Sequence, residues 1–157
     1  MKNIKLWVAP TRRFCFSVED AHKYKKLVED KLKEWNVDFV NIDSINREGL
    51  LINAGDSKKA AELFKKEKVD AVFSPHVNFG TEEVVAGMAK EVGKPFLLWG
   101  PRDESPLEGG VRLRDTQCRR HSIFVFGLKF FRPAIGKKAF AGFAKVIIKP
   151  DITELGL

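Results

Sequence analysis

Polar side chains of several chemical kinds follow two successive apolar runs, VDAVF and PFLLW, within residues 69–118 of this chain. They are an imidazole, an amide, guanidinium groups and carboxylates, namely His76, Asn78, Arg102, Asp103, Arg112 and Asp115. An imidazole can move a proton or donate a hydrogen bond, and the other groups can bind hydroxyls or an anion. Loops that follow parallel strands meet in one crevice beyond the carboxyl ends of those strands. We therefore predict a small-molecule site lined by these six residues, with Trp99 at its floor.

Each of these residues also has a purely structural explanation. His76 could cap a neighbouring loop, and the segment from Asn78 to Thr81 could be a capped turn before a helix. Arg102 and Asp103 could form a surface ion pair, which contributes little to stability. The same choice holds for Arg112, Arg114 and Asp115. A tryptophan in a strand, such as Trp99, is more often part of the core than of a site. Both interpretations stay open on the sequence.

Apolar runs alternate with segments of helical spacing along the chain. Strands are predicted at residues 4–9, 37–42, 70–74 and 95–99, and helices from Ser17 or Asp20, from Asp56 or Ser57, and from Thr81. The first helix has one apolar stripe, consisting of Ala21, Tyr24, Leu27, Val28, Leu32 and Trp35. This alternation predicts a three-layer, doubly wound α/β fold, flavodoxin-like or Rossmann-like. We expect a parallel sheet of four or five strands with the first strand central.

The 157 residues are expected to form a single α/β domain, with a divergent basic segment at residues 119–157. A helix is predicted from Asp115 or Thr116 to Phe126, which runs into that segment. Residues 137–149 within it suit either a helix or a fifth strand. No apolar run approaches the roughly 20 residues that span a bilayer, which predicts no membrane association. The two cysteines lack metal-ligand spacing and suit a reduced, cytoplasmic protein.

The net charge of +7 is concentrated late in the chain. Residues 112–149 contain ten lysines and arginines against one acid, whereas residues 1–111 are balanced. A basic block can mark a nucleic-acid face, so a basic regulatory or nucleic-acid-binding module is the alternative function. The phenylalanines in this block have core-like spacings rather than those of a stacking platform, which argues against nucleic acid.

Familiar catalytic patterns are missing from the sequence. It contains no G-x-x-x-x-G-K-[ST], no G-x-G-x-x-G, no G-x-S-x-G and no H-E-x-x-H. Its His, Asp and Glu residues form no convincing metal set. From its residues alone, the chain is a ligand-binding α/β domain with no catalytic residue, metal ligand or cofactor site of its own.

The segment VDAVFSPHVNFGTEEV, the run PFLLWGPRDE and above all GVRLRDTQC resemble the amino-terminal region of the L-fucose/L-arabinose isomerase family, especially its fucose-isomerase-like members. The resemblance covers about residues 1–118. It implies aldose–ketose isomerisation with a divalent metal, usually manganese, whose ligands lie downstream in the family and have no counterpart here. It also implies a sugar ligand, and a homo-oligomer in which amino-terminal domains help to build the substrate pocket.

The chain departs from the family pattern after Cys118, where it continues RRHSIFVFGLKFFRP, basic and aromatic. The change in charge and the loss of similarity begin at the same place. A truncated or frame-shifted relative, catalytically incomplete on its own, would account for both.

Overall fold

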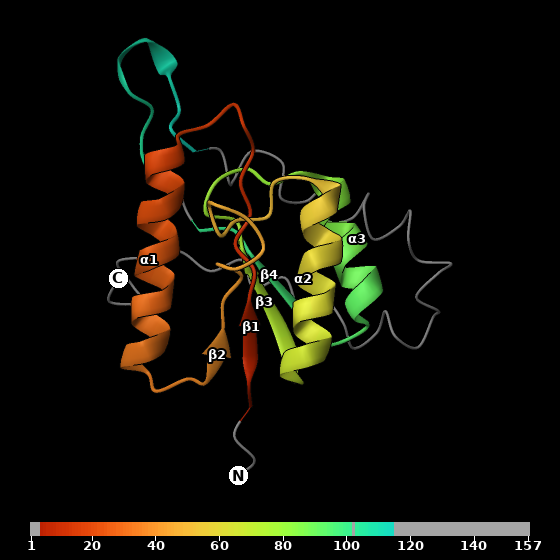
Figure 1. The fold of residues 1–157 in the computed structure, drawn as a ribbon. Helices are drawn as coiled ribbons and strands as arrows, with labels where there is room; N and C mark the ends of the chain where they lie inside the picture. The colour runs from red at the N-terminus through yellow and green to blue at the C-terminus, as the bar shows by residue number, and fades with distance from the viewer. Residues whose placement is uncertain (1–3, 102, 115–157) are drawn as a thin grey trace.

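The computed structural model describes residues 4–101 and 103–114 (Figure 1). Its elements are, in chain order, β1 (Leu6–Val8), α1 (Val18–Glu34), β2 (Phe39–Val40), α2 (Ala54–Glu67), β3 (Ala71–Pro75), α3 (Glu82–Val92), β4 (Phe96–Trp99) and the 3-10 turn η1 (Glu108–Gly110). The predicted helix after Asp115 and the predicted element at residues 137–149 lie outside the described residues.

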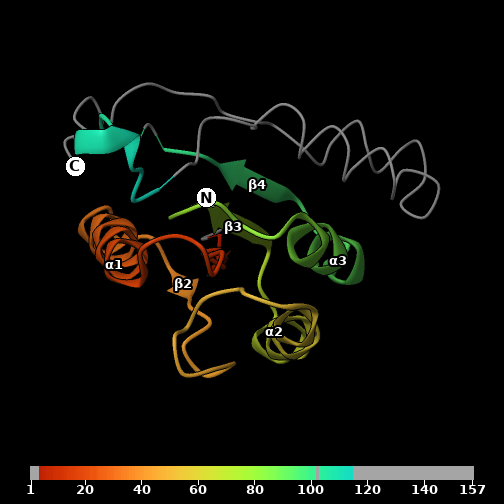
Figure 2. The same ribbon diagram turned by 90° about the horizontal axis from the view of Figure 1, so that it is seen from above.

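The strands form one parallel sheet in the order β2-β1-β3-β4. Viewed along the strands, α1 lies on one face of the sheet, and α2 and α3 lie on the other (Figure 2). The predicted three-layer parallel fold is therefore confirmed. β1 is an interior strand between β2 and β3, as expected for the first strand.

Successive side chains of each strand point to opposite faces of the sheet, and each face has its own hydrophobic core. Trp7 and Val72 point toward α2 and α3, where Trp7 packs on Phe64 with ring centroids 5.4 Å apart. Val8 and Trp99 instead pack under α1, against Val28 and Leu32. This period of two is what a strand buried on both faces requires.

Local signals begin and end the helices. Ser17 caps α1, since its Oγ accepts a hydrogen bond from the Asp20 backbone N–H at 3.1 Å. The predicted start of α2 was wrong, because the cap is Asn53. In a capping box, the Asp56 backbone N–H donates to Asn53 Oδ1, and Asp56 Oδ2 accepts from the Asn53 backbone N–H. Gly93 ends α3 with φ 58°, a conformation that glycine adopts without strain.

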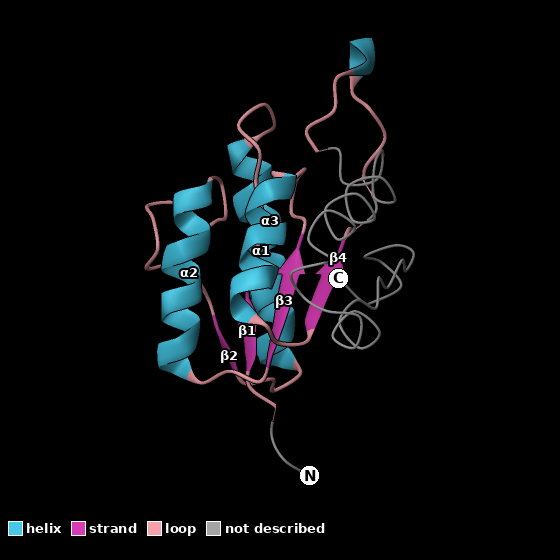
Figure 3. Ribbon diagram, turned by 90° about the vertical axis from the view of Figure 1, so that its right-hand side faces the viewer, coloured by secondary structure: helices cyan, strands magenta, loops and turns pink. Residues whose placement is uncertain are grey.

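Beyond β4 the chain projects past the helix ends at the carboxyl edge of the sheet (Figure 3). We call residues 104–114 the arm; it contains η1. The Leu107 backbone N–H donates to the Val111 carbonyl at 2.9 Å, and the Gly110 N–H donates to the Leu107 carbonyl at 3.0 Å. These bonds close the tip of the arm. Within the described residues, no helix combines the length and apolar character needed to cross a membrane.

Gly80 makes the closest backbone approach at this edge. A Cβ added to Gly80 would lie 2.6 Å from Thr11 Oγ1 and 2.7 Å from Thr11 Cβ, both shorter than real Cβ contacts. Thr11 is fully buried, so it has little room to move. The loops after β1 and β3 therefore meet only because residue 80 has no side chain.

We expect Gly80→Ala to lower the free energy of unfolding by about 1–3 kcal/mol, the usual cost of overpacking a rigid site. The matched control is Gly87→Ala inside α3, where an added Cβ meets nothing within 4 Å. That substitution should raise stability by about 0.5–1 kcal/mol, because alanine favours a helix. Urea unfolding of both variants measures the two effects. Equal stability of both variants would contradict the close approach.

Candidate functional site

The strand order places a topological switch point between β1 and β3. From β1 the chain reaches β2 on one side, and it later returns through β3 on the other side. In doubly wound sheets, ligands bind outside the carboxyl ends of the strands at such a point. The loops at this edge of the sheet are residues 9–17 after β1, 76–81 after β3 and 100–114 after β4.

Asn78 fills the switch point with its own side chain. It is fully buried; its Oδ1 accepts from the Arg13 backbone N–H at 2.9 Å, and its Nδ2 donates to the Ser17 carbonyl at 3.2 Å. Both polar ends of the amide are thus used to hold the loop after β1. Asn78 therefore links the loop after β3 to the loop after β1.

His76 follows β3 directly and is 6% exposed. Its backbone N–H donates to the Trp99 carbonyl at 2.7 Å, which extends the pairing of β3 with β4 by one residue. Its Nε2 is buried and has no hydrogen-bond partner among the described residues. Burial lowers the pKa of His76 to about 4, since a charged imidazolium is poorly solvated there. The ring is therefore neutral at neutral pH.

Trp99 ends β4 with its ring on the α1 face. The ring is 8% exposed and lies against Phe73, with centroids 6.0 Å apart. It belongs to the core cluster with Val8, Val28 and Leu32.

Arg114 anchors the base of the arm. Its Nε and Nη2 donate to Glu104 Oε2 at 3.2 and 2.9 Å, and its Nη2 lies 4.0 Å from an Asp103 oxygen. Its guanidinium carbon lies 3.5 Å from the centre of the Tyr24 ring on α1. Charge-assisted bonds and a cation–π contact together hold a residue that is only 2% exposed. The arm is consequently fastened both to itself and to α1.

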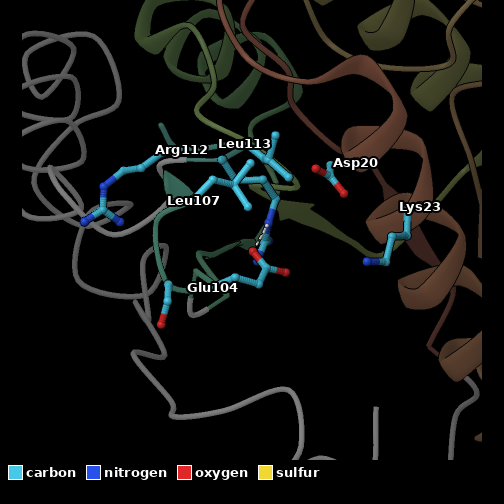
Figure 4. Close-up of a pocket in the computed structure, with 8 residues that line it drawn as sticks. Asp20, Lys23, Glu104, Leu107, Arg112 and Leu113 are labelled. Carbon is cyan, nitrogen blue, oxygen red and sulfur yellow. Dashed lines mark hydrogen bonds and ion pairs between the residues drawn. The ribbon is translucent and has the colours of Figure 1, made fainter. Parts of the chain in front are cut away.

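A hollow of about 160 Å³ lies between the first turns of α1 and the arm. Its lining consists of Asp20, Lys23, Glu104, Ser105, Leu107, Arg112, Leu113 and Arg114. Figure 4 shows Lys23 reaching from α1 toward the arm, whereas the Arg112 guanidinium points away from α1. The Ser17 backbone N–H donates to the Leu113 carbonyl at 3.2 Å. This bond holds the end of the arm close to the start of α1.

The predicted site residues thus occupy several environments at one edge of the sheet. Asn78 ties two loops, Trp99 packs in the α1-side core, and Asp103 faces Arg114. Of the predicted site residues that the structure describes, only Arg112 lines the hollow. Arg102 and Asp115 lie outside the described residues. Whether they share one ligand stays a prediction.

The predicted site did not include Arg114, Glu104 or Tyr24, although the sequence places Arg114 and Glu104 in the same polar segments as the predicted residues. The signal was present for one of the contacts: an arginine lies ten residues after an acid, with two glycines between them that allow the chain to turn back. The Tyr24 contact had no such signal, because it joins segments 90 residues apart.

Comparison with known proteins identifies the family of this chain. A family model described as fucose/sulfoquinovose isomerase, N-terminal domain, matches residues 8–123. The chain belongs to this family. The match confirms the resemblance seen in the sequence, and it extends five residues past Cys118. No curated protein and no solved structure matches this fucose-isomerase-like domain.

The described residues offer no set of ligands for the divalent metal that the resemblance to the isomerase family implies. They contain no group of three or more His, Cys, Asp and Glu side chains that could hold an ion. Asp103 and Glu104 lie at the base of the arm, and both face the Arg114 guanidinium. Manganese prefers carboxylate and water oxygens, and a cation at these carboxylates would have to displace the arginine.

Burial of a neutral His76 predicts a pH dependence of folding. The unfolded state binds a proton near pH 6.5 and the folded state only near pH 4, so stability falls as the pH drops through this window. The loss should reach up to about 3 kcal/mol at pH 4 and should be absent from His76→Leu. Urea unfolding between pH 7.5 and pH 4 measures it.

The control is His22→Leu, because His22 is exposed on α1. This variant should keep the pH dependence of the unsubstituted protein. A His76→Leu protein with the same pH dependence as the parent would show that His76 is not the titrating group.

Proposed function

We propose that the fucose-isomerase-like domain forms part of the wall of a sugar-binding pocket, at the carboxyl edge of its sheet. In this proposal the domain contributes hydrogen bonds and shape. The groups that move hydrogen between adjacent carbons of the sugar come from outside residues 4–114. The ligand is an aldose or ketose of the class that the family description names, a fucose or a sulfoquinovose.

The observation that carries the proposal is the buried Nε2 of His76 after β3, which has no hydrogen-bond partner within the part of the chain that the structure describes. A buried polar atom without a partner is unfavourable and is uncommon in folded proteins, so it commonly marks a site that a ligand or water completes. A neutral imidazole offers one donor and one acceptor, which suits a sugar hydroxyl.

The same ring is poorly suited to acid–base chemistry near pH 7. A general acid or base works best when its pKa is close to the operating pH. Burial sets the pKa of His76 at about 4, far below neutrality. The ring therefore supports recognition, and the proton transfers of an isomerase would need other residues.

Sugar titration with backbone-amide NMR tests the binding role. L-fucose, L-arabinose and sulfoquinovose should be added to the full chain up to tens of millimolar. We expect the dissociation constant to be on the order of 1 mM, because a few hydrogen bonds to an open wall supply limited free energy. The shifted amides should belong to the loops after β1, β3 and β4.

His76→Leu should abolish these shifts, and His22→Leu, the exposed control, should keep them. Shifts confined to the amino edge of the sheet, or unchanged binding by His76→Leu, would overturn the proposed site. D-glucitol, which has no carbonyl group, measures how far binding depends on hydroxyls alone.

An assay of the full chain with manganese and the same sugars tests the division of labour. Aldose–ketose exchange requires a polarising ion or base at the reacting carbons, which His76 does not supply. We expect no turnover above background. A rate of about 1 per second or more, which is typical of enzymes, would contradict the proposal.

A further inference from the structure

Two opposite charges on the first turns of α1 line the hollow without an ionic partner in the described part of the chain. Asp20 and Lys23 are three residues apart on the helix, a spacing at which oppositely charged side chains commonly pair. They make no such pair, and the Asp20 carboxylate accepts no hydrogen bond from a described residue. The Lys23 ammonium lies 5.2 Å from the centre of the Tyr24 ring and forms no ion pair with a described residue. Figure 4 shows both charged groups on the side of α1 that faces the arm.

The other charged residues of the lining are already paired or directed elsewhere. Glu104 is paired with Arg114, whose Nη2 lies 2.9 Å from the Glu104 carboxylate. The Arg112 guanidinium points away from α1 (Figure 4). One acid and one base therefore remain for a ligand, and both come from the α1 wall of the hollow.

The arm supplies an apolar wall across from these charges. Leu107 and Leu113 line the hollow and are 53% and 40% exposed, so an apolar group that enters removes part of their surface from water. The hollow measures about 160 Å³, and an engineered protein cavity of about 150 Å³ binds benzene. A branched apolar side chain of similar bulk therefore fits between the arm and α1.

We propose that this hollow binds a free α-amino acid with an apolar side chain, such as leucine. The ammonium group of the ligand pairs with Asp20, and its carboxylate pairs with Lys23. Its side chain packs between Leu107 and Leu113. The site uses no group of His76, so its occupancy does not depend on the proposed sugar pocket.

A ligand with both charges matches the hollow better than a ligand with one charge or none. An organic anion or an organic cation leaves one of the two α1 charges unpaired, and a neutral sugar leaves both unpaired. An α-amino acid carries both charges on groups attached to one carbon, so it reaches both helix side chains at once. Arg114 holds the arm through Glu104 and Tyr24, so little ordering is needed when the ligand binds.

Titration of the full chain with L-leucine up to tens of millimolar, followed by backbone-amide NMR, tests the proposal. We expect a dissociation constant on the order of 1 mM, and shifts of the amides in the first turns of α1 and in the arm. Isocaproate lacks the ammonium group and isoamylamine lacks the carboxylate, so each should bind about threefold more weakly or worse. Glycine, which has no side chain to bury, should bind about tenfold more weakly.

Two charge substitutions with matched controls test the residues. Asp20→Asn should weaken L-leucine binding about threefold, whereas Glu19→Gln should leave it unchanged. Glu19 is an exposed acid of the same first turn that does not line the hollow, so this control removes the same charge from the same helix end. Lys23→Gln should also weaken binding about threefold, and Lys26→Gln, which changes an exposed lysine outside the lining, should not. The spread of the amide signals shows that each variant is folded.

Several results would overturn the proposal. Absence of shifts with L-leucine, or shifts confined to residues outside α1 and the arm, would exclude the site. Equal affinities for L-leucine and isocaproate would show that the hollow recognises only an anion. Equal weakening by Asp20→Asn and Glu19→Gln would show that the general charge of the helix end, and not a contact with Asp20, attracts the ligand.

Discussion

The carboxyl edge of this domain depends on one buried amide. Asn78 accepts from the Arg13 N–H and donates to the Ser17 carbonyl, so it fixes the middle and the end of the loop that leads from β1 into α1. A fully buried amide is costly unless both of its polar ends are satisfied, and these two bonds satisfy them. Since Ser17 also caps α1, the start of that helix is positioned by a side chain from the loop after β3. The order of the strands and the position of α1 are thereby linked.

This tie explains why the open space at the edge lies away from the switch point. In a doubly wound sheet the crevice between the loops after the two diverging strands is the expected ligand site. Here Asn78 bridges those loops, and Gly80 presses its backbone against Thr11. The hollow instead lies between α1 and the arm. Arg114 keeps it open, because the Glu104 pair and the Tyr24 contact hold the arm at a fixed distance from the helix.

Patterns local in sequence were sufficient for the fold. Alternating strand and helix signals predicted the parallel sheet, and Ser17 and Gly93 marked helix ends through rules that involve only a few residues. The apolar stripe of α1 is buried at Ala21, Tyr24, Val28 and Leu32 but fails at Trp35, which is half exposed. The failure has a physical reason: α1 ends at Glu34, so Trp35 has left the helical spacing and lies past the last turn.

The candidate site was less predictable because its contacts are long-range. An asparagine before a helix has the same local sequence whether it binds a ligand or links two loops. For Asn78, only the positions of Arg13 and Ser17 in the folded chain show that it links two loops. The role of Arg114 is equally hidden in the local sequence, because its contact with the Tyr24 ring joins segments 90 residues apart. The residue types at a strand end indicate where a site can lie. The tertiary structure decides which of those polar groups are already hydrogen-bonded within the protein and which can bind a ligand.

His76 illustrates the remaining step from geometry to chemistry. The sequence left two roles open for it, proton transfer and hydrogen bonding, because an isolated imidazole with a pKa near 6.5 can do both. Burial separates the two roles. It removes the charged form at neutral pH and keeps the donor and the acceptor of the neutral ring. Burial also removes water as a partner of Nε2, so the free energy of a hydrogen bond there is available to whatever reaches the edge of the sheet. In the proposed pocket, this burial therefore disfavours His76 as an acid or base near pH 7 and suits its neutral ring to hydrogen bonding with a ligand.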